Sequence, residues 1–83
     1  MMNLEAKNIL VTGAPGGIGS QISQQLNAAG ANLALHDLSE SALKSLRAAL
    51  PANNNHIETI AMNLMDTGAG TELVKQAHQR LGG

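Results

Sequence analysis

Eight residues at positions 12–19 combine a tight turn with the start of a helix, and they read Thr-Gly-Ala-Pro-Gly-Gly-Ile-Gly. A short β-branched run, residues 8–12, precedes the turn, as expected of a buried parallel strand. The stretch that follows has apolar residues at helical spacing, at Ile18, Ile22, Leu26 and Ala29, and then Gly30. The first N–H groups of a helix lack acceptors, and the helix dipole adds about half a positive charge there. The pattern therefore predicts a site for phosphate groups.

The glycines of this turn have separate roles. Gly13 can adopt the positive φ that takes the chain sharply out of the strand. Gly17 lets the backbone approach a pyrophosphate without an intervening Cβ, and Gly19 permits close packing of the helix on the sheet. A plain glycine-rich turn is the alternative, but the strand before it and the helix after it favour phosphate binding.

An acidic residue ends the second predicted strand. Residues 31–36 form an apolar run that leads to Asp37, about twenty residues after the glycine turn. A carboxylate at the carboxyl end of such a strand can accept hydrogen bonds from the ribose of a dinucleotide. Alternatively, Asp37 caps the next helix, but Ser39 suits that role better, because it precedes Glu40 and lies between Leu38 and Leu43 in a hydrophobic staple. We therefore predict that Asp37 binds ribose.

With these residues the chain resembles the short-chain dehydrogenase/reductase family. Its Thr12-Gly13, followed by three residues and Gly17-Ile18-Gly19, is similar to the family's cofactor fingerprint, and Asp37 matches the acidic residue of NAD-preferring members. Because Gly16 is also present, the segment equally fits the spacing of the extended, epimerase-like branch of the family. The resemblance implies cofactor contacts from Gly13, Gly16, Gly17, Ile18, Gly19, Asp37 and Leu38.

The third predicted strand, residues 56–62, carries a further contact that the resemblance implies. In the family this strand usually ends in Asp-Val, where the Asp side chain and the next backbone unit meet the adenine. This chain has Asn63-Leu64 instead. An amide oxygen still accepts a hydrogen bond from the adenine amino group, so Asn63 and Leu64 join the predicted cofactor-binding residues. The second helix and this strand favour the main branch of the family.

Along the chain, strand and helix patterns alternate three times without a linker or a repeat. We expect an α/β fold, a partial Rossmann domain over residues 1–83 with a three-stranded parallel sheet in the order 3-2-1. The first two helices should cover one face of the sheet and the third helix the other. The second helix, residues 40–50, should bury Leu43, Leu46 and Leu50, and the third should share one face among Leu73, Val74, Ala77 and Leu81.

Composition limits the classes of function. The chain has 83 residues, a net charge of −1 and no aromatic residue, which argues against nucleic-acid binding. Without cysteine it has no disulfide and no thiolate metal site. The three histidines, His36, His56 and His78, lack metal-ligand spacing, and we expect each to be exposed to solvent and without a role. No leader or membrane span is evident, so a soluble cytoplasmic protein without membrane contact is expected.

Catalytic residues are missing from the pattern. Members of the family act on alcohols and ketones with a tyrosine acid/base, a lysine four residues later, and a serine and an asparagine, all beyond the third helix. This chain contains no tyrosine. We therefore predict the NAD-binding N-terminal segment of a short-chain dehydrogenase/reductase, not catalytically competent by itself, with no catalytic or metal-binding residue assigned.

Two alternatives and two further expectations remain. The chain can instead be a fragment of an extended-branch epimerase or dehydratase, or a stand-alone nucleotide-binding module without chemistry. NAD is favoured over NADP because no Arg or Lys occurs at Ala14, Pro15, Gly16 or Leu38. The resemblance also implies that the full-length parent is a homo-oligomer.

Overall fold

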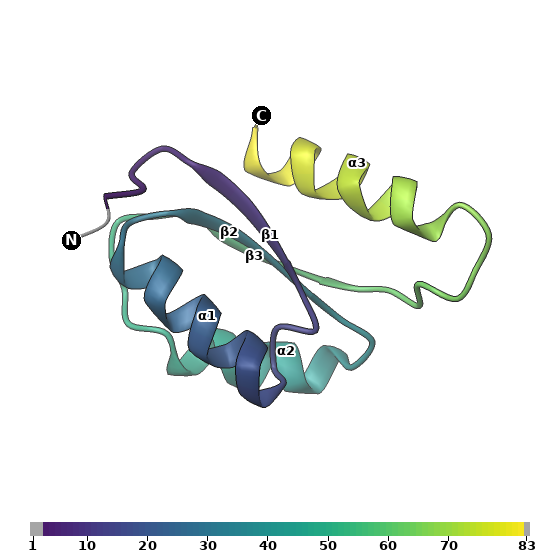
Figure 1. Cartoon of the computed structure of the whole chain (residues 1–83), viewed down its shortest axis with the longest axis horizontal. Coiled ribbons are helices and arrows are strands. Elements are labelled where there is room, and N and C mark those ends of the chain that lie inside the picture. The colour runs from purple at the N-terminus through teal and green to yellow at the C-terminus, as the bar shows by residue number, and fades with distance from the viewer. Residues whose placement is uncertain (1–2, 83) are drawn as a thin grey trace.

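The computed structural model describes residues 3–82 and contains three strands that alternate with three helices (Figure 1). The elements in chain order are β1 (Asn8–Thr12), α1 (Gly17–Ala28), β2 (Asn32–Asp37), α2 (Glu40–Ala49), β3 (Ile57–Ala61) and α3 (Ala69–Leu81). Each lies within a few residues of its predicted position. None of the helices in this part of the chain has the length and apolar character needed to cross a membrane.

The strands form one parallel sheet with β2 in the centre. Val11 lies beside Leu35 and Leu35 beside Thr59, so the three strands are in register along their whole lengths. Helices α1 and α2 cover one face of the sheet and α3 covers the other (Figure 1). The expected α/β fold and strand order are therefore confirmed.

Two aliphatic clusters, one on each face, hold the layers together. On the face of α1 and α2 the buried side chains are Val11, Ala14, Ala31, Leu33, Leu35, Leu43, Leu46 and Leu50. On the face of α3 they are Ala34, Ile60, Leu73 and Ala77. The three leucines predicted to anchor α2 are all in the first cluster, so the 3.6-residue period identified that buried face correctly.

Helix α1 buries only part of the face that its apolar spacing predicts, because Leu26 packs against the first cluster but the other buried side chains are different ones. Ile18 is 78% exposed, whereas Ser23 and Asn27 are buried. The Ser23 hydroxyl donates to the Gly19 carbonyl over 2.8 Å, and Asn27 Nδ2 donates to the Pro51 carbonyl over 2.8 Å. Small and hydrogen-bonded side chains let this helix pack close to the sheet. Val74 of α3, also predicted to be buried, is 60% exposed.

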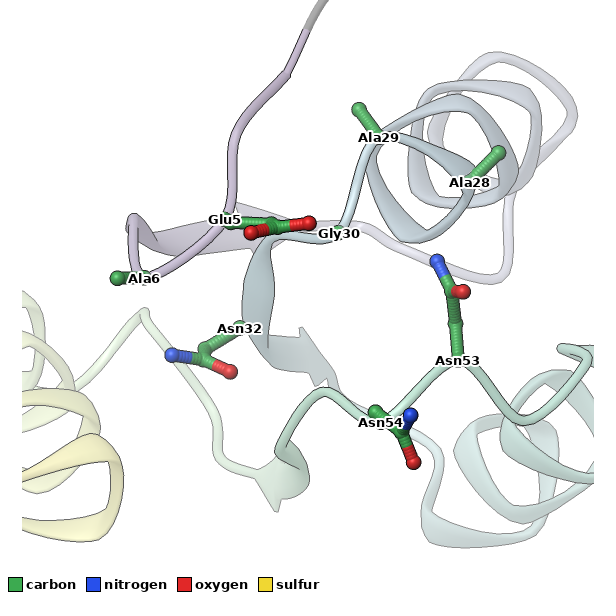
Figure 2. A pocket seen from close by; sticks show the side chains of 8 residues that line it. All are labelled: Glu5, Ala6, Ala28, Ala29, Gly30, Asn32, Asn53 and Asn54. Atoms are coloured by element: carbon green, nitrogen blue, oxygen red, sulfur yellow. The ribbon is translucent and has the colours of Figure 1, made fainter.

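Asparagine amides join the segments at the amino ends of the strands. Asn55 Nδ2 donates to Asn27 Oδ1 over 2.8 Å, and Asn53 Nδ2 donates to the Asn27 carbonyl over 2.6 Å. A hollow of about 620 Å³ lies beside them, and Figure 2 shows Asn53 pointing from its loop toward the end of α1. The hollow is at the opposite end of the sheet from the glycine turn, because α1 starts at that turn and ends beside the hollow.

The two edge strands of the described sheet differ in how well they are protected. On β3, Arg80 Nη1 donates to the Thr59 carbonyl over 3.2 Å and lies 3.9 Å from Glu58 Oε1, so charged groups line that edge. β1 contains no charged residue. A shallow hollow of about 170 Å³ runs beside β1 between Leu10 and the exposed Val74. Unpaired, uncharged edges are templates for further strand pairing.

We expect the 83-residue chain to self-associate through β1, because an uncharged edge and the apolar groove beside it lie together. Val74→Lys should lower the associated fraction by placing a charge in that groove. Size-exclusion chromatography with light scattering measures this, with detection at peptide-bond wavelengths since aromatic residues are absent. Ser45→Lys, on the exposed face of α2, is the matched control. If both variants lower the associated fraction equally, the contact between copies of the chain lies outside the groove beside β1.

Candidate functional site

The carboxyl ends of all three strands meet at one edge of the sheet and are tied together there. The Ala14 N–H donates to the His36 carbonyl over 3.0 Å, which holds the glycine turn against β2. The Met62 N–H donates to the Asp37 carbonyl over 3.1 Å, which holds the end of β3 against β2. The structure thus brings the glycine turn, Asp37 and Asn63-Leu64 to the same edge, where ligands of parallel α/β sheets bind.

The glycine turn leaves the start of α1 without a side-chain cap. Gly13 has φ +63°, and its carbonyl accepts the Gly16 N–H over 3.1 Å, which closes the turn. Gly16 is the N-cap residue and makes no side-chain hydrogen bond, and the first turn of α1 has no acidic residue. The N–H groups of the first helical residues, Gly17 to Gly19, are therefore available to an external anion.

Gly17 and Gly19 face different surroundings. A Cβ built on Gly17 meets no atom within 4 Å, so its surface is open. A Cβ built on Gly19 lies 2.2 Å from the Gly13 carbonyl oxygen and 3.0 Å from the Ala14 Cα. Gly19 is thus needed for packing, as predicted, although its contact is with the turn rather than with the sheet. Gly17 is not needed for packing, and its open surface leaves room for a ligand to approach the start of α1.

The capping role predicted for Ser39 is confirmed, and the Asp37 carboxylate contacts the same turn. Ser39 is the N-cap of α2, and its Oγ accepts the Ala42 N–H over 3.2 Å. Asp37 Oδ2 accepts the Ser39 N–H over 3.0 Å, and Oδ1 has no hydrogen-bond partner within residues 3–82. The predicted staple between Leu38 and Leu43 is absent, because Leu38 is 70% exposed. Within the described residues, the unpartnered Oδ1 of Asp37 is thus adjacent in sequence to an exposed apolar side chain.

The segment after β3 forms its own small turn. Asn63 Oδ1 accepts the Met65 N–H over 2.9 Å, so the side-chain amide is held in one orientation. Leu64 is 43% exposed. The amide oxygen has a second lone pair and can accept a further hydrogen bond. This edge thus carries backbone donors at α1, a carboxylate acceptor at Asp37 and an amide at Asn63.

The prediction that His36 is exposed is wrong. Its residue is only 5% exposed, and its Nε2 donates to the Met62 carbonyl over 2.9 Å. The reason is its position near the end of the central strand, two residues after Ala34 and therefore on the face of the sheet that α3 covers. This burial had a signal in the sequence, because His36 directly precedes Asp37 near the end of the strand expected in the middle of the sheet. His56 and His78 are exposed, and residues 3–82 contain no cluster of metal-ligating side chains.

Residues 7–83 match the short chain dehydrogenase family. The chain is 33% identical over 81 residues to 1-deoxy-11-beta-hydroxypentalenate dehydrogenase from Streptomyces avermitilis, covering 98% of this chain and 30% of that protein. This chain therefore spans about a third of the length of such relatives.

Solved structures agree with the family match. A short-chain dehydrogenase/reductase from Brucella melitensis superimposes with a TM-score of 0.86 and 34% identity, over 99% of this chain and 34% of that one. A metagenomic short-chain oxidoreductase, solved in complex with NADP, superimposes with a TM-score of 0.84 and 25% identity, over 95% of this chain and 36% of that one.

The surroundings of the two glycines predict opposite effects on stability. Gly19→Ala should destabilise the fold by about 1–3 kcal/mol, because its Cβ overlaps the Gly13 carbonyl. Gly17→Ala should be neutral or stabilise the fold by up to about 1 kcal/mol, because it restricts the unfolded chain and meets open space. Denaturant unfolding followed by circular dichroism measures both. Equal loss of stability in the two variants would contradict the close contact at Gly19.

Proposed function

The chain belongs to the short-chain dehydrogenase family, and from this premise we propose that it binds the adenosine diphosphate half of NAD for an oxidoreductase. The observation that carries the proposal is the meeting of the uncapped α1 start, the Asp37 carboxylate and the Asn63 amide at one sheet edge. These three groups match the pyrophosphate, the ribose and the adenine in order along a dinucleotide.

The pyrophosphate is assigned to the start of α1. Its negative charge is favoured by the helix dipole and by the N–H groups of Gly17, Ile18 and Gly19. Gly13 and Gly16 keep the turn compact, and the open surface at Gly17 admits the phosphate oxygens. Backbone donors alone hold the anion in this assignment, since no Lys or Arg occurs between Thr12 and Gly19.

The ribose is assigned to Asp37. Oδ2 accepts a hydrogen bond from the Ser39 N–H, and this bond restricts rotation of the carboxylate. Oδ1 is then the acceptor for a ribose hydroxyl, a charge-assisted hydrogen bond of about 1.5–3 kcal/mol. A 2′-phosphate in the same place meets the negative carboxylate without a compensating cation, because Leu38 and Ser39 follow.

The adenine is assigned to the exposed apolar side chains beside these groups. Leu38 follows β2 and Leu64 follows β3, and both are exposed in the absence of a ligand. Because β2 and β3 are neighbours, the two leucines follow adjacent strand ends and offer apolar surface to a flat base. Asn63 supplies the acceptor for the adenine amino group through the second lone pair of Oδ1.

The redox step is assigned to the whole protein of which this chain forms the cofactor-binding part, a partial Rossmann domain over residues 1–83. NAD supplies a hydride acceptor for an alcohol or, when reduced, a hydride donor for a ketone. This chain's residues would bind and orient the adenosine half of the cofactor. The absence of tyrosine within these residues supports a catalytic acid/base from outside them. We also propose that the whole protein is a cytoplasmic homo-oligomer.

Gly17→Val should abolish NAD binding while it preserves the helical content, because its branched side chain occupies the space of the pyrophosphate. Isothermal calorimetry beside circular dichroism measures both properties. Gly70→Val in the first turn of α3 is the matched control, because a Cβ there also meets open space. If Gly17→Val binds NAD as tightly as this control does, the glycines serve only the turn.

NAD should bind at least tenfold more tightly than NADP. Two unit charges about 4 Å apart repel by roughly 4 kcal/mol at an effective dielectric constant of about 20. Asp37→Asn should narrow the difference, because the amide removes the charge and keeps the shape. Parallel titrations of both dinucleotides into both proteins test this. Tighter binding of NADP by the unaltered protein would refute the assignment of Asp37 to ribose.

A further inference from the structure

His36 occupies the point at which backbone pairing between β2 and β3 ends. The last paired residues are Asp37 and Ala61, and the Met62 N–H still reaches the Asp37 carbonyl over 3.1 Å. In a continuing parallel ladder the Met62 carbonyl would accept the N–H of Ser39. That N–H is diverted to Asp37 Oδ2, because α2 begins there. The Met62 carbonyl would therefore lack its backbone donor.

The imidazole of His36 supplies the missing donor. Nε2 lies 2.9 Å from the Met62 carbonyl oxygen. Since a carbonyl only accepts, Nε2 carries the hydrogen. Nδ1 is enclosed and has no partner within the described residues, so an N–H there would have no acceptor. The surroundings thus favour the tautomer whose hydrogen is on Nε2 and is directed at Met62.

The Met62 carbonyl belongs to the peptide unit that joins Met62 to Asn63. Both backbone groups of Met62 are bonded to β2: its N–H donates to the Asp37 carbonyl, and its carbonyl accepts from His36 Nε2. After it, the turn from Asn63 Oδ1 to the Met65 N–H orients the side-chain amide. Leu64 and Met65 are exposed and contribute little packing of their own. Hydrogen bonds rather than burial therefore hold this segment.

We propose that His36 is a positioning residue that fixes the Asn63-Leu64 segment in the orientation needed to read the adenine of the cofactor. The proposal rests on the proposed function for its ligand. Its structural half, that the His36–Met62 hydrogen bond orders residues 62–65, is independent of any ligand. His36 acts through Met62 in this proposal and not by contact with the cofactor, because its residue is buried and its Nε2 bonds to the Met62 carbonyl.

The ligand-free test is amide hydrogen exchange of residues 62–65 in the 83-residue chain. His36→Leu removes the donor and should accelerate this exchange by about fivefold, the equivalent of one typical hydrogen bond. His36→Gln places an amide N–H at a similar reach and should restore slow exchange. His78→Leu, on the exposed face of α3, is the matched control. Unchanged exchange in His36→Leu would overturn the proposal.

The ligand test compares NAD with nicotinamide hypoxanthine dinucleotide, which lacks the adenine amino group. Calorimetry on the original chain should show about fivefold tighter binding of NAD, and His36→Leu should bring the ratio close to one. His36→Gln should keep the preference. Equal weakening of both ligands by His36→Leu, with the ratio preserved, would show a merely structural role and overturn the proposal.

Failure of the proposed function gives a different result. If the original chain binds neither dinucleotide, the cofactor assignment fails in every variant, and the exchange rates of residues 62–65 alone judge the role of His36. If the original chain binds both dinucleotides equally, Asn63 does not read the amino group, and the adenine part of the proposal is overturned even where exchange responds to His36→Leu.

Discussion

The parallel pairing of β2 with both of its neighbours is the constraint on which the site depends. Three strands in register must end at the same edge, so residues that are far apart in sequence leave the sheet together. Hydrogen bonds from Ala14 to His36 and from Met62 to Asp37 extend this order past the strand ends. A shift of one residue in either register would exchange the two faces of a strand and move Leu33 and Leu35 out of their cluster. The aliphatic core thus fixes the positions of the polar groups at the edge.

The two ends of the sheet differ in how far their polar groups are hydrogen-bonded within the chain. At the amino ends, the Asn27 amide and carbonyl are engaged by Pro51, Asn53 and Asn55, so the buried polar atoms there are satisfied within the chain. At the carboxyl ends, the first N–H groups of α1 and the Oδ1 of Asp37 have no side-chain partner in the described residues. Unused donors and acceptors on a rigid edge cost little reorganisation when a ligand arrives. The second end is therefore the one suited to binding, although a hollow of about 620 Å³ lies at the first.

Sequence patterns predicted the elements, the strand order and the core face of α2, because leucines at a strict helical period have only one way to be buried. They were only partly right for α1, where Leu26 packs against the core but Ile18 and Ile22, at the same period, remain exposed. The contact of Gly19 holds the start of α1 against the glycine turn, and the small polar side chains of Ser23 and Asn27 lie on the buried face. Hydrophobic periodicity ranks side chains by hydrophobicity and does not include the distance between the helix and the sheet. It therefore does not identify the buried face of a helix that packs through small residues.

His36 shows a second limit of the same kind. A histidine near a strand end is polar in composition, but its burial depends on the strand being central and on the helix above it, which are properties of topology. Once the strand order is known, its role follows from hydrogen-bond accounting. The start of α2 takes the Ser39 N–H away from the ladder, so a carbonyl at Met62 is left without a backbone donor, and the His36 side chain supplies one. The capping of α2 and the hydrogen bond from His36 to Met62 are thus two consequences of ending β2 at Asp37.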